Sequence, residues 1–272
     1  MVTAAQPAAL HGPAPGEGPP PRFGPVARVA ALSDVHGNIP ALEAVLSDVD
    51  SAGAELVVFC GDLTWGPEPH RTVEVVRELG ARAVFVRGNA DRAAVQLARH
   101  GRAHERPRDP WMIIQHTDAD LDFLAGFAFT ATIEVVGLGP VRFCHGSPRS
   151  DTELITPATP PDRFADLSRD IDERVLVSGH THIQFDRTVA GRRSVNPGSV
   201  GLPYHEGAPG TAYWALLGPD VELRQSRYDL TVALDRAGRV GDPSAELQAT
   251  LLTRPPTPAE VTAHGESLVF SD

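Results

Sequence analysis

The chain has 272 residues, of which 42% are hydrophobic, and a formal net charge of −11 at pH 7. This length fits one domain with an ample hydrophobic core. The acidic balance argues against a protein that binds duplex nucleic acid, which needs a basic surface, and no apolar run is long enough to span a membrane.

Residues 1–25 are rich in Ala, Pro and Gly. Such a segment cannot bury enough apolar surface to offset the entropy of ordering. We therefore predict a disordered leader over residues 1–25, without the basic start and apolar stretch of a secretory signal. A single domain is expected over residues 26–252, followed by a tail over residues 253–272.

The first predicted strand covers residues 29–32, and two polar side chains of one segment follow it. Asp34 and His36 are two positions apart, so in an extended chain they point the same way. Gly37 lets the backbone turn, and Asn38 and Pro40 are typical of the start of a helix. One short segment can thus offer a carboxylate and an imidazole to one cation.

Four further apolar runs end in the same way, at a turn with glycine and a possible metal ligand. They deliver, in chain order, Asp62, Asn89, His145, and the pair His180 and His182. Buried strands of an α/β fold bring such residues together at one rim. The sequence therefore predicts a shared site built from five strand ends.

The remaining elements follow from hydrophobic periodicity and turn signals. Helices are predicted over residues 68–79, 91–100, 118–125, 162–171, 229–237 and 244–252, with a polar surface loop over 101–110. Strands are predicted over residues 130–136, 140–144, 174–177, 184–189, 192–195, 211–217 and 221–227. The change from alternating strands and helices to hairpins predicts two packed sheets with helices outside.

The candidate ligands comprise two Asp, one Asn and four His. This mixed set suits Mn²⁺, Fe, Zn or Ni better than Ca²⁺, which prefers oxygen alone. Seven ligands exceed the needs of one tetrahedral site, so two cations that share a ligand are the simplest interpretation. Among the metals we favour Mn²⁺.

Together the five blocks resemble the signature of calcineurin-like metallophosphoesterases: Asp34-x-His36, Gly61-Asp62, Gly88-Asn89-x-Asp91, His145-Gly and Gly179-His180-x-His182. The later Asn196-Pro-Gly-Ser-Val-Gly201 resembles the small bacterial and archaeal phosphodiesterase branch. The resemblance implies a four-layer α/β/β/α sandwich of two mixed sheets. It also implies that Asp62 bridges two metals, with Asp34, His36 and His182 on the first and Asn89, His145 and His180 on the second.

This resemblance implies hydrolysis of a phosphodiester or nucleotide phosphoanhydride by water activated between two cations. Catalysis is assigned to Asp62, Asn89, His145 and His180, and the expected partner is a small phosphorylated substrate, a nucleotide among the classes considered. Two alternatives stay open, a phosphomonoesterase or protein Ser/Thr phosphatase of the same fold and a non-catalytic metal-binding scaffold. The substrate and the oligomeric state are not written in the sequence.

One position departs from the family pattern. Many members have His after the Asn of the third block, where it can assist the leaving group, but here Ala90 stands in its place. We expect Asp91 to orient a ligand histidine. His70 and His205 are candidates to replace the missing acid, whereas His100, His104 and His116 are interpreted as solvated surface residues.

Trp65 follows the third ligand in its loop and has two interpretations. It either packs over the loop or forms a wall for a substrate ring. The only two cysteines, Cys60 and Cys144, end apolar runs and are interpreted as buried free thiols. A chain without disulfides is typical of the cytoplasm, which we predict as its location.

Overall fold

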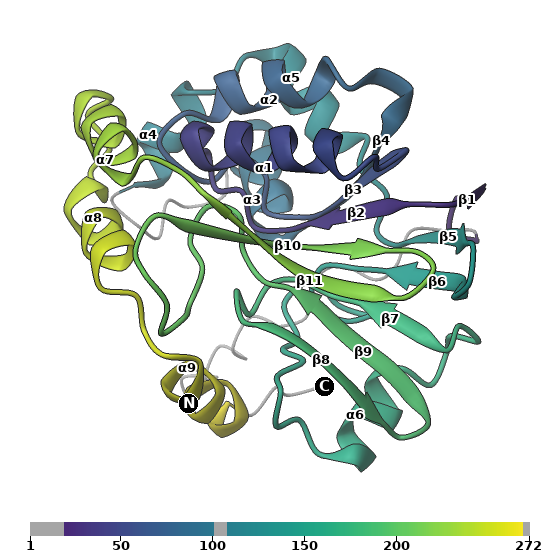
Figure 1. The fold of residues 1–272 in the computed structure, drawn as a ribbon. Helices are drawn as coiled ribbons and strands as arrows, with labels where there is room; N and C mark the ends of the chain where they lie inside the picture. Colours follow the sequence, from purple (N-terminus) through teal and green to yellow (C-terminus); the bar gives the residue numbers. More distant parts are fainter. Residues whose placement is uncertain (1–18, 101–107, 269–272) are drawn as a thin grey trace, which may run out of the picture.

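A computed structural model describes residues 19–100 and 108–268. It places them in two stacked β-sheets with helices on both outer faces (Figure 1). The five-stranded sheet has the order β11-β10-β2-β3-β4. Its parallel members are β2 (Val29–Leu32), β3 (Leu56–Cys60) and β4 (Ala83–Val86), and its antiparallel members are β10 (Thr211–Leu217) and β11 (Val221–Arg227). The carboxyl ends of β2, β3 and β4 therefore meet at one edge.

The six-stranded sheet has the order β1-β5-β6-β7-β9-β8. Neighbours β6, β7 and β9 are parallel, whereas β5 pairs with β6 and β8 with β9 in antiparallel fashion. The bounds are β1 (Arg22–Val26), β5 (Ala131–Val135), β6 (Gly139–Phe143), β7 (Val175–Val177), β8 (Gln184–Val189) and β9 (Arg192–Pro197). Both sheets are mixed, as predicted.

Strand β2 shows how one short apolar run serves two cores. Val29 and Ala31 belong to the cluster between the two sheets, whereas Ala30 and Leu32 pack toward the helices on the outer face. Successive side chains of a strand point to opposite faces, so a strand buried on both sides must be apolar throughout. All four residues of β2 are fully buried.

Helices cover the outer face of each sheet and complete the predicted four layers. On the five-stranded sheet lie α1 (Ile39–Ser51), α2 (Pro69–Arg77), α3 (Asn89–His100) and α5 (Asp118–Ala125), with buried residues in the same cluster as Leu32 and Phe59. On the six-stranded sheet, α6 (Pro161–Leu167) buries Phe164 and Leu167 against Leu176 and Phe185. Asn38 caps α1 by accepting from the Ala41 amide, as its position predicts.

The predicted leader needs a correction, and the predicted tail contains a helix. Residues 1–18 of the predicted leader lie outside the described residues, but Arg22–Val26 forms β1, which pairs in parallel with β5. This strand was missed because Gly24 and Pro25 interrupt its pattern, which an edge position tolerates. In the predicted tail, α9 (Pro258–Ser267) starts with a capping box between Thr257 and Glu260, a signal that the sequence carries.

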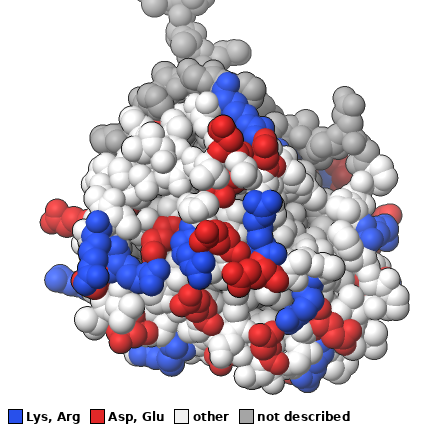
Figure 2. Space-filling view, turned by 90° about the horizontal axis from the view of Figure 1, so that it is seen from above, with Lys and Arg blue, Asp and Glu red and all other residues white. Residues whose placement is uncertain are grey.

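The predicted loop over residues 101–110 also differs in part. Residues 101–107 lie outside the described residues, and the six-residue helix α4 (Asp109–Ile114) starts at the loop's end. A short 3₁₀ turn, η1 (Gly80–Arg82), precedes β4. No described helix has the length and apolarity needed to cross a membrane. On the face above α1, α2 and α5, acidic and basic side chains are interspersed (Figure 2).

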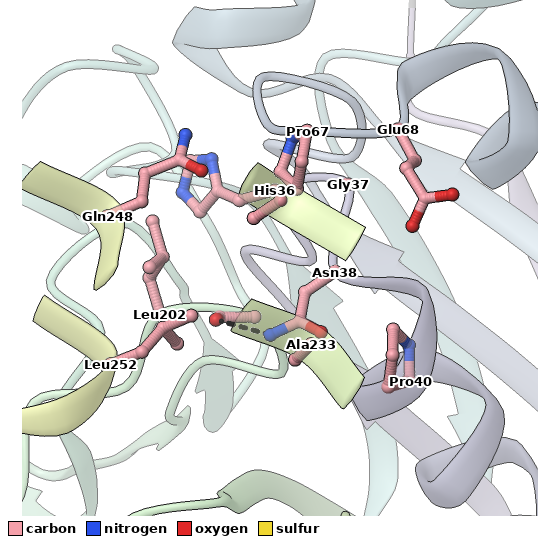
Figure 3. Close-up of a pocket in the computed structure, with 12 residues that line it drawn as sticks. His36, Gly37, Asn38, Pro40, Pro67, Glu68, Leu202, Ala233, Gln248 and Leu252 are labelled. Atoms are coloured by element: carbon pink, nitrogen blue, oxygen red, sulfur yellow. Dashed lines mark hydrogen bonds between the residues drawn. The ribbon is translucent and has the colours of Figure 1, made fainter. Parts of the chain in front are cut away.

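The last part of the chain returns to the ligand-bearing edge of the five-stranded sheet. Helix α7 (Leu230–Arg239) packs against α1 and against α8 (Ala245–Thr253). Together with the loop after β2 they border a small pocket beside His36, lined mainly by apolar side chains and by Asn38, Glu68 and Gln248 (Figure 3). The C-terminal helices thus form a wall next to the predicted site.

Candidate metal centre

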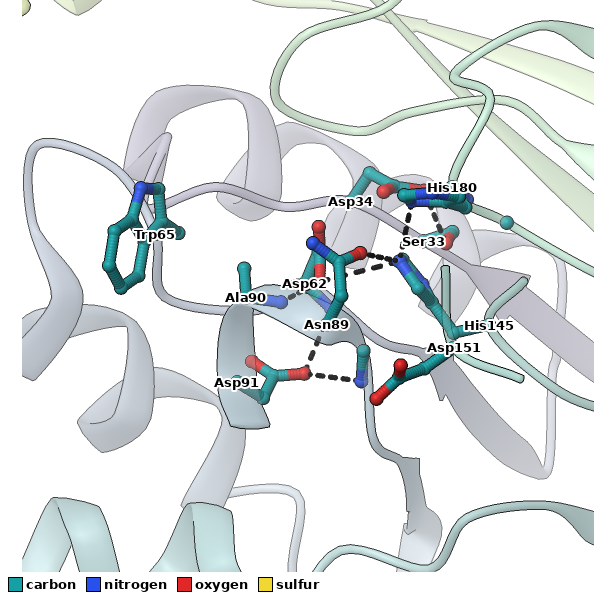
Figure 4. A network of polar contacts seen from close by, with 12 residues as sticks. Ser33, Asp34, Asp62, Trp65, Asn89, Ala90, Asp91, His145, Asp151 and His180 are labelled. Atoms are coloured by element: carbon teal, nitrogen blue, oxygen red, sulfur yellow. Dashed lines mark hydrogen bonds and ion pairs between the residues drawn. The ribbon is translucent and has the colours of Figure 1, made fainter. Parts of the chain in front are cut away.

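The five predicted strand ends converge. Asp34 and His36 follow β2, Asp62 follows β3, and Asn89 opens α3 just after β4. From the other sheet, His145 follows β6, and His180 and His182 follow β7. Figure 4 shows His145 and His180 facing Asn89, Asp62 and Asp34 across the junction of the two sheets.

One set of side chains, here called the first group, consists of Asp34, His36 and His182. The two Nε2 atoms of His36 and His182 are 3.2 Å apart, and His182 Nε2 lies 3.1 Å from Asp34 Oδ1. One atom of each residue lies within 4.8 Å of the others. This spacing fits three donors around one small cation.

The second group consists of Asp62, Asn89, His145 and His180. His145 Nε2 lies 2.9 Å from Asn89 Oδ1, 3.1 Å from His180 Nδ1 and 3.3 Å from Asp62 Oδ1. The second oxygen of Asp62, Oδ2, lies 3.9 Å from His36 Nε2 in the first group. Asp62 therefore presents one oxygen to each group, the arrangement that a bridging carboxylate requires.

Backbone carbonyls orient three of the histidines. The Nδ1 atom lies 3.1 Å from the Trp65 carbonyl in His36, 2.7 Å from the Cys60 carbonyl in His145, and 2.6 Å from the Leu202 carbonyl in His182. A neutral imidazole has one N–H, so donation from Nδ1 to a carbonyl leaves the Nε2 lone pair free. In all three, Nε2 is the atom that faces the other ligands, as in histidines that bind metals.

Five of the seven candidate ligands have a left-handed backbone. The φ angles are 54° for Asp34, 47° for His36, 53° for Asp62, 66° for His180 and 58° for His182. Among the described residues, only Ala190, in a hairpin turn, is a further non-glycine with positive φ. This conformation is uncommon for residues with a β-carbon, and its concentration here marks a functional site.

The electrostatics of the first group fit a cation. Asp34 is fully buried; its Oδ2 accepts from Ser33 Oγ at 2.5 Å and from the His180 amide at 3.0 Å, but Oδ1 has no hydrogen-bond partner. Burial alone would raise the pKa of Asp34, yet the surrounding imidazoles, foremost His182, lower it to about 2. An ionised carboxylate with an unpaired buried oxygen calls for a positive partner.

Two of the neighbouring imidazoles are in the neutral state that binds a metal. Burial lowers the pKa of both His36 and His180 to about 4, with a further contribution from the neighbouring histidines. Both rings are neutral at pH 7, and metal ligation requires a neutral imidazole. Burial also disfavours the charged form of His145 and His182, but the carboxylates of Asp62 and Asp34 raise the pKa of His145 to about 10 and that of His182 above its usual value. These two rings must therefore release a proton when a metal binds. The set of buried carboxylates and imidazoles fits divalent transition metals.

Asp91 has a different role from the predicted one. Its carboxylate contacts no histidine within hydrogen-bond distance; it accepts from the backbone amides of Asp62, Leu63 and Gly88, each at 2.9 Å. Burial, and then the charge of Asp62, raise the pKa of Asp91 to about 6. Asp91 thus joins the two ligand-bearing turns after β3 and β4 through their backbones.

The segment Asn196–Gly201 contacts the backbone that carries ligands of both groups. The Asn196 amide donates to the Gly179 carbonyl at 2.8 Å, and Ser199 Oγ donates to the Asp34 carbonyl at 2.7 Å. Gly198 has a φ of 81°, whereas Gly201 allows a close approach: a β-carbon there would lie 1.8 Å from the Val35 carbonyl oxygen. The segment therefore holds the turn between Asp34 and His36.

Gly201→Ala should lower the free energy of unfolding by about 1–3 kcal/mol, the usual cost of overpacking, and should weaken metal binding by the first group. The reason is that the added methyl must displace the Val35 backbone, between two ligands. Denaturant unfolding and Mn²⁺ titration measure the two effects. Gly238→Ala is the matched control, since a β-carbon there meets no atom within 4 Å. Equal stability of the two variants would contradict this role.

The structure also places several other histidines, and Trp65, that the sequence analysis singled out. His116 is buried, with Nε2 2.9 Å from Thr64 Oγ1, so its interpretation as a solvated residue was wrong. His104 lies outside the described residues. His70 is half-exposed and pairs with Asp120 at 2.8 Å. Trp65 is half-buried and packs against the hydrophobic cluster under the helices of the five-stranded sheet. Its backbone carbonyl lies within hydrogen-bond distance of His36 Nδ1.

Two residues that support the ligands were not predicted from the sequence, one acting through its backbone and one through its side chain. Leu202 contributes only a carbonyl, and Ser33 a hydroxyl 2.5 Å from Asp34. A backbone carbonyl that accepts a hydrogen bond leaves no pattern of residue types in the sequence. The adjacency of Ser33 to Asp34 was the one available signal.

Comparison with known proteins yields a family match. Residues 28–216 match the calcineurin-like phosphoesterase superfamily domain. The chain is 28% identical to the phosphodiesterase YfcE of Escherichia coli K12 over 182 residues, which are 63% of this chain and 78% of YfcE. It is 25% identical to the uncharacterized protein MJ0912 of Methanocaldococcus jannaschii over 228 residues, 76% of this chain and 90% of that protein.

Solved structures resemble most of this chain. A metallophosphoesterase from Sphaerobacter thermophilus is 26% identical with a TM-score of 0.65, covering 84% of this chain and 98% of its own. The protein PH1004 of Pyrococcus horikoshii is 19% identical with a TM-score of 0.72, covering 85% of this chain and 99% of its own. Because PH1004 is only 19% identical, its similarity to this chain concerns the fold alone.

Proposed function

Because the chain belongs to the calcineurin-like phosphoesterase superfamily and is a hydrolase of phosphoric esters, we propose that it is a phosphodiesterase that uses two divalent metal ions. The bonds it hydrolyses are phosphodiesters or nucleotide phosphoanhydrides. Asp34, His36 and His182 hold the first ion, Asn89, His145 and His180 hold the second, and Asp62 is shared. The similarity to YfcE, a phosphodiesterase, supports this substrate class.

The observation that carries the proposal is the pairing of the two groups through Asp62. Its Oδ1 and Oδ2 face different histidine clusters. Asp34 Oδ1, which is buried without a hydrogen bond and lies 3.1 Å from His182 Nε2, supports a cation at the first group. Two bound cations would supply Lewis-acid stabilisation of a phosphoryl group and of an attacking water. We favour Mn²⁺, with Fe, Zn or Ni as alternatives.

The chain's own residues supply orientation. Three carbonyls fix the tautomers of His36, His145 and His182, and Asp91 fixes the turns that carry Asp62 and Asn89. The Ala90 amide, in the first turn of α3, donates to Asp62 Oδ1 at 2.8 Å. Among the described residues at the centre, none is a serine or cysteine activated as the nucleophile of a covalent hydrolase. This fits direct attack by water.

The proposal includes a small phosphorylated substrate and a cytoplasmic location. Cys60 and Cys144 are both buried and unpaired, as is common in reducing compartments. The net charge of −11 and the absence of a purely basic patch on the face shown in Figure 2 support a small substrate over duplex nucleic acid.

Purified protein should turn over a bis-nitrophenyl diester or a dinucleoside polyphosphate when loaded with Mn²⁺, and lose this activity after treatment with a chelator. A nitrophenyl monoester tests the phosphomonoesterase alternative in parallel. Hydrolysis of the monoester alone would favour that alternative. Two bound Mn²⁺ without turnover of any ester would favour a scaffold, and an absence of Mn²⁺ binding would refute the proposal.

A further inference from the structure

We propose that Arg236, on helix α7, is a positioning residue for the first group: it holds Glu68 and thereby fixes the loop whose backbone orients His36. This inference rests on the proposed function, because it concerns the site's affinity for its metal. Arg236 lies outside residues 28–216, the part of the chain that matches the family domain.

The contact between α7 and the loop is a two-bond ion pair. Arg236 Nε lies 2.7 Å from Glu68 Oε2, and its NH2 lies 2.6 Å from Glu68 Oε1. Such a fork-to-carboxylate pair fixes direction as well as distance. The Glu68 side chain is 16% exposed and that of Arg236 is 39% exposed, so the pair is shielded on the carboxylate side.

The loop between β3 and α2 connects Glu68 to His36. Its Trp65 carbonyl lies 3.1 Å from His36 Nδ1 and fixes the tautomer. Gly66 packs so closely that a β-carbon would lie 1.4 Å from the His36 carbonyl oxygen. A shift of this loop would therefore move the acceptor that orients the His36 ring.

A second set of contacts keeps α7 and α8 in place. Arg108 pairs with the buried Asp242 at the turn between the two helices, and Gln248 of α8 donates to the same carboxylate at 3.1 Å. Ala233, Leu252 and Gln248 line the pocket beside His36, which has a volume of about 10 Å³ (Figure 3). These contacts fix α7 and α8 relative to each other, so Arg236 on α7 can restrain the loop between β3 and α2.

Among the described residues, Arg236 makes no comparable ion pair that would restrain a ligand of the second group. Its histidines are oriented by the Cys60 carbonyl and by neighbouring ligands. Loss of the ion pair should consequently weaken one of the two metal sites more than the other. A purely structural role would instead lower stability without separating the two sites.

Stepwise Mn²⁺ titration of the metal-free protein, followed by the EPR signal of free Mn²⁺, tests the inference. In Arg236→Ala, one of the two affinities should fall roughly tenfold, the lower end of the range for partners of metal ligands, while the other changes by less than about threefold. Arg236→Lys, which keeps the charge but not the fork, should lie between Arg236→Ala and the parent protein. Thermal melting of each metal-free variant shows that it is folded.

Arg239→Ala is the matched control, because Arg239 lies on the same helix and pairs with Asp235 in solvent. Two affinities in Arg236→Ala equal to those of this control would overturn the inference, as would an equal loss at both sites. Either outcome, with two Mn²⁺ bound by the parent protein, leaves the proposed function intact. A parent protein that binds no Mn²⁺ would refute both.

Discussion

Asp62→Ala should lose most of the bound metal and reduce phosphodiester hydrolysis by more than about a hundredfold. Its two oxygens face different ligand groups, at 3.3 Å from His145 and 3.9 Å from His36. Loss of a partner that only supports a metal ligand already costs about 10–100-fold, so loss of a shared ligand should cost more. Elemental analysis and diester turnover measure the two effects.

Two further variants make this result interpretable. Asp62→Asn keeps the shape of the side chain and tolerates the left-handed backbone at this position, so it separates loss of charge from a folding defect. His36→Ala should weaken the first group alone. Retention of two metal equivalents by both Asp62 variants would show that this carboxylate is not a bridge.

Turnover should depend steeply on the acidity of the leaving group, with nitrophenyl esters and phosphoanhydrides hydrolysed much faster than alkyl esters. Ala90 cannot donate a proton, and His70, one of the two alternatives from the sequence, is engaged. Both nitrogens of His70 face carboxylates, Asp120 at 2.8 Å and Glu74 at 3.5 Å. The measurement is a series of diesters under conditions where the chemical step limits the rate.

Ala90→His should flatten this dependence and accelerate the poorest leaving groups most. General acid catalysis contributes about 10²–10⁴-fold, which sets the scale of the gain. Figure 4 shows Ala90 between Trp65 and the side chains of Asp62 and Asn89, so a ring there would adjoin the second group. Ala90→Asn controls for added bulk at this buried position. A flat dependence in the parent enzyme would indicate that another acid already acts, and His205 would be tested next.

Much of the fold could be predicted because its signals are local. The strands Thr211–Leu217 and Val221–Arg227 and the helix Asp118–Ala125 match their predicted bounds. Apolar runs, glycine turns and caps carry that information within a few residues. By contrast, β1 depends on pairing with β5, more than a hundred positions away, and its own sequence contains Gly24 and Pro25.

The seven candidate ligands come together as the spacing of strand ends predicted, but their assignment to two metals remains a proposal. What the sequence could not reveal is the supporting backbone. The acceptors for His36 and His182 are carbonyls of Trp65 and Leu202, which any residue type could provide. Likewise, Glu68 and Arg236 are 168 positions apart, and only the packing of α7 brings them into contact.

The left-handed backbone at five candidate ligands has an evolutionary consequence. A residue with a β-carbon in this conformation costs about 1–2 kcal/mol relative to the right-handed region, a cost that glycine avoids and asparagine reduces. Selection for stability alone would therefore replace these residues, whereas the proposed metal binding would favour keeping them. A lineage released from catalysis should lose Asp34, Asp62 and His180 to glycine or asparagine early, and gain stability as it becomes a pseudoenzyme.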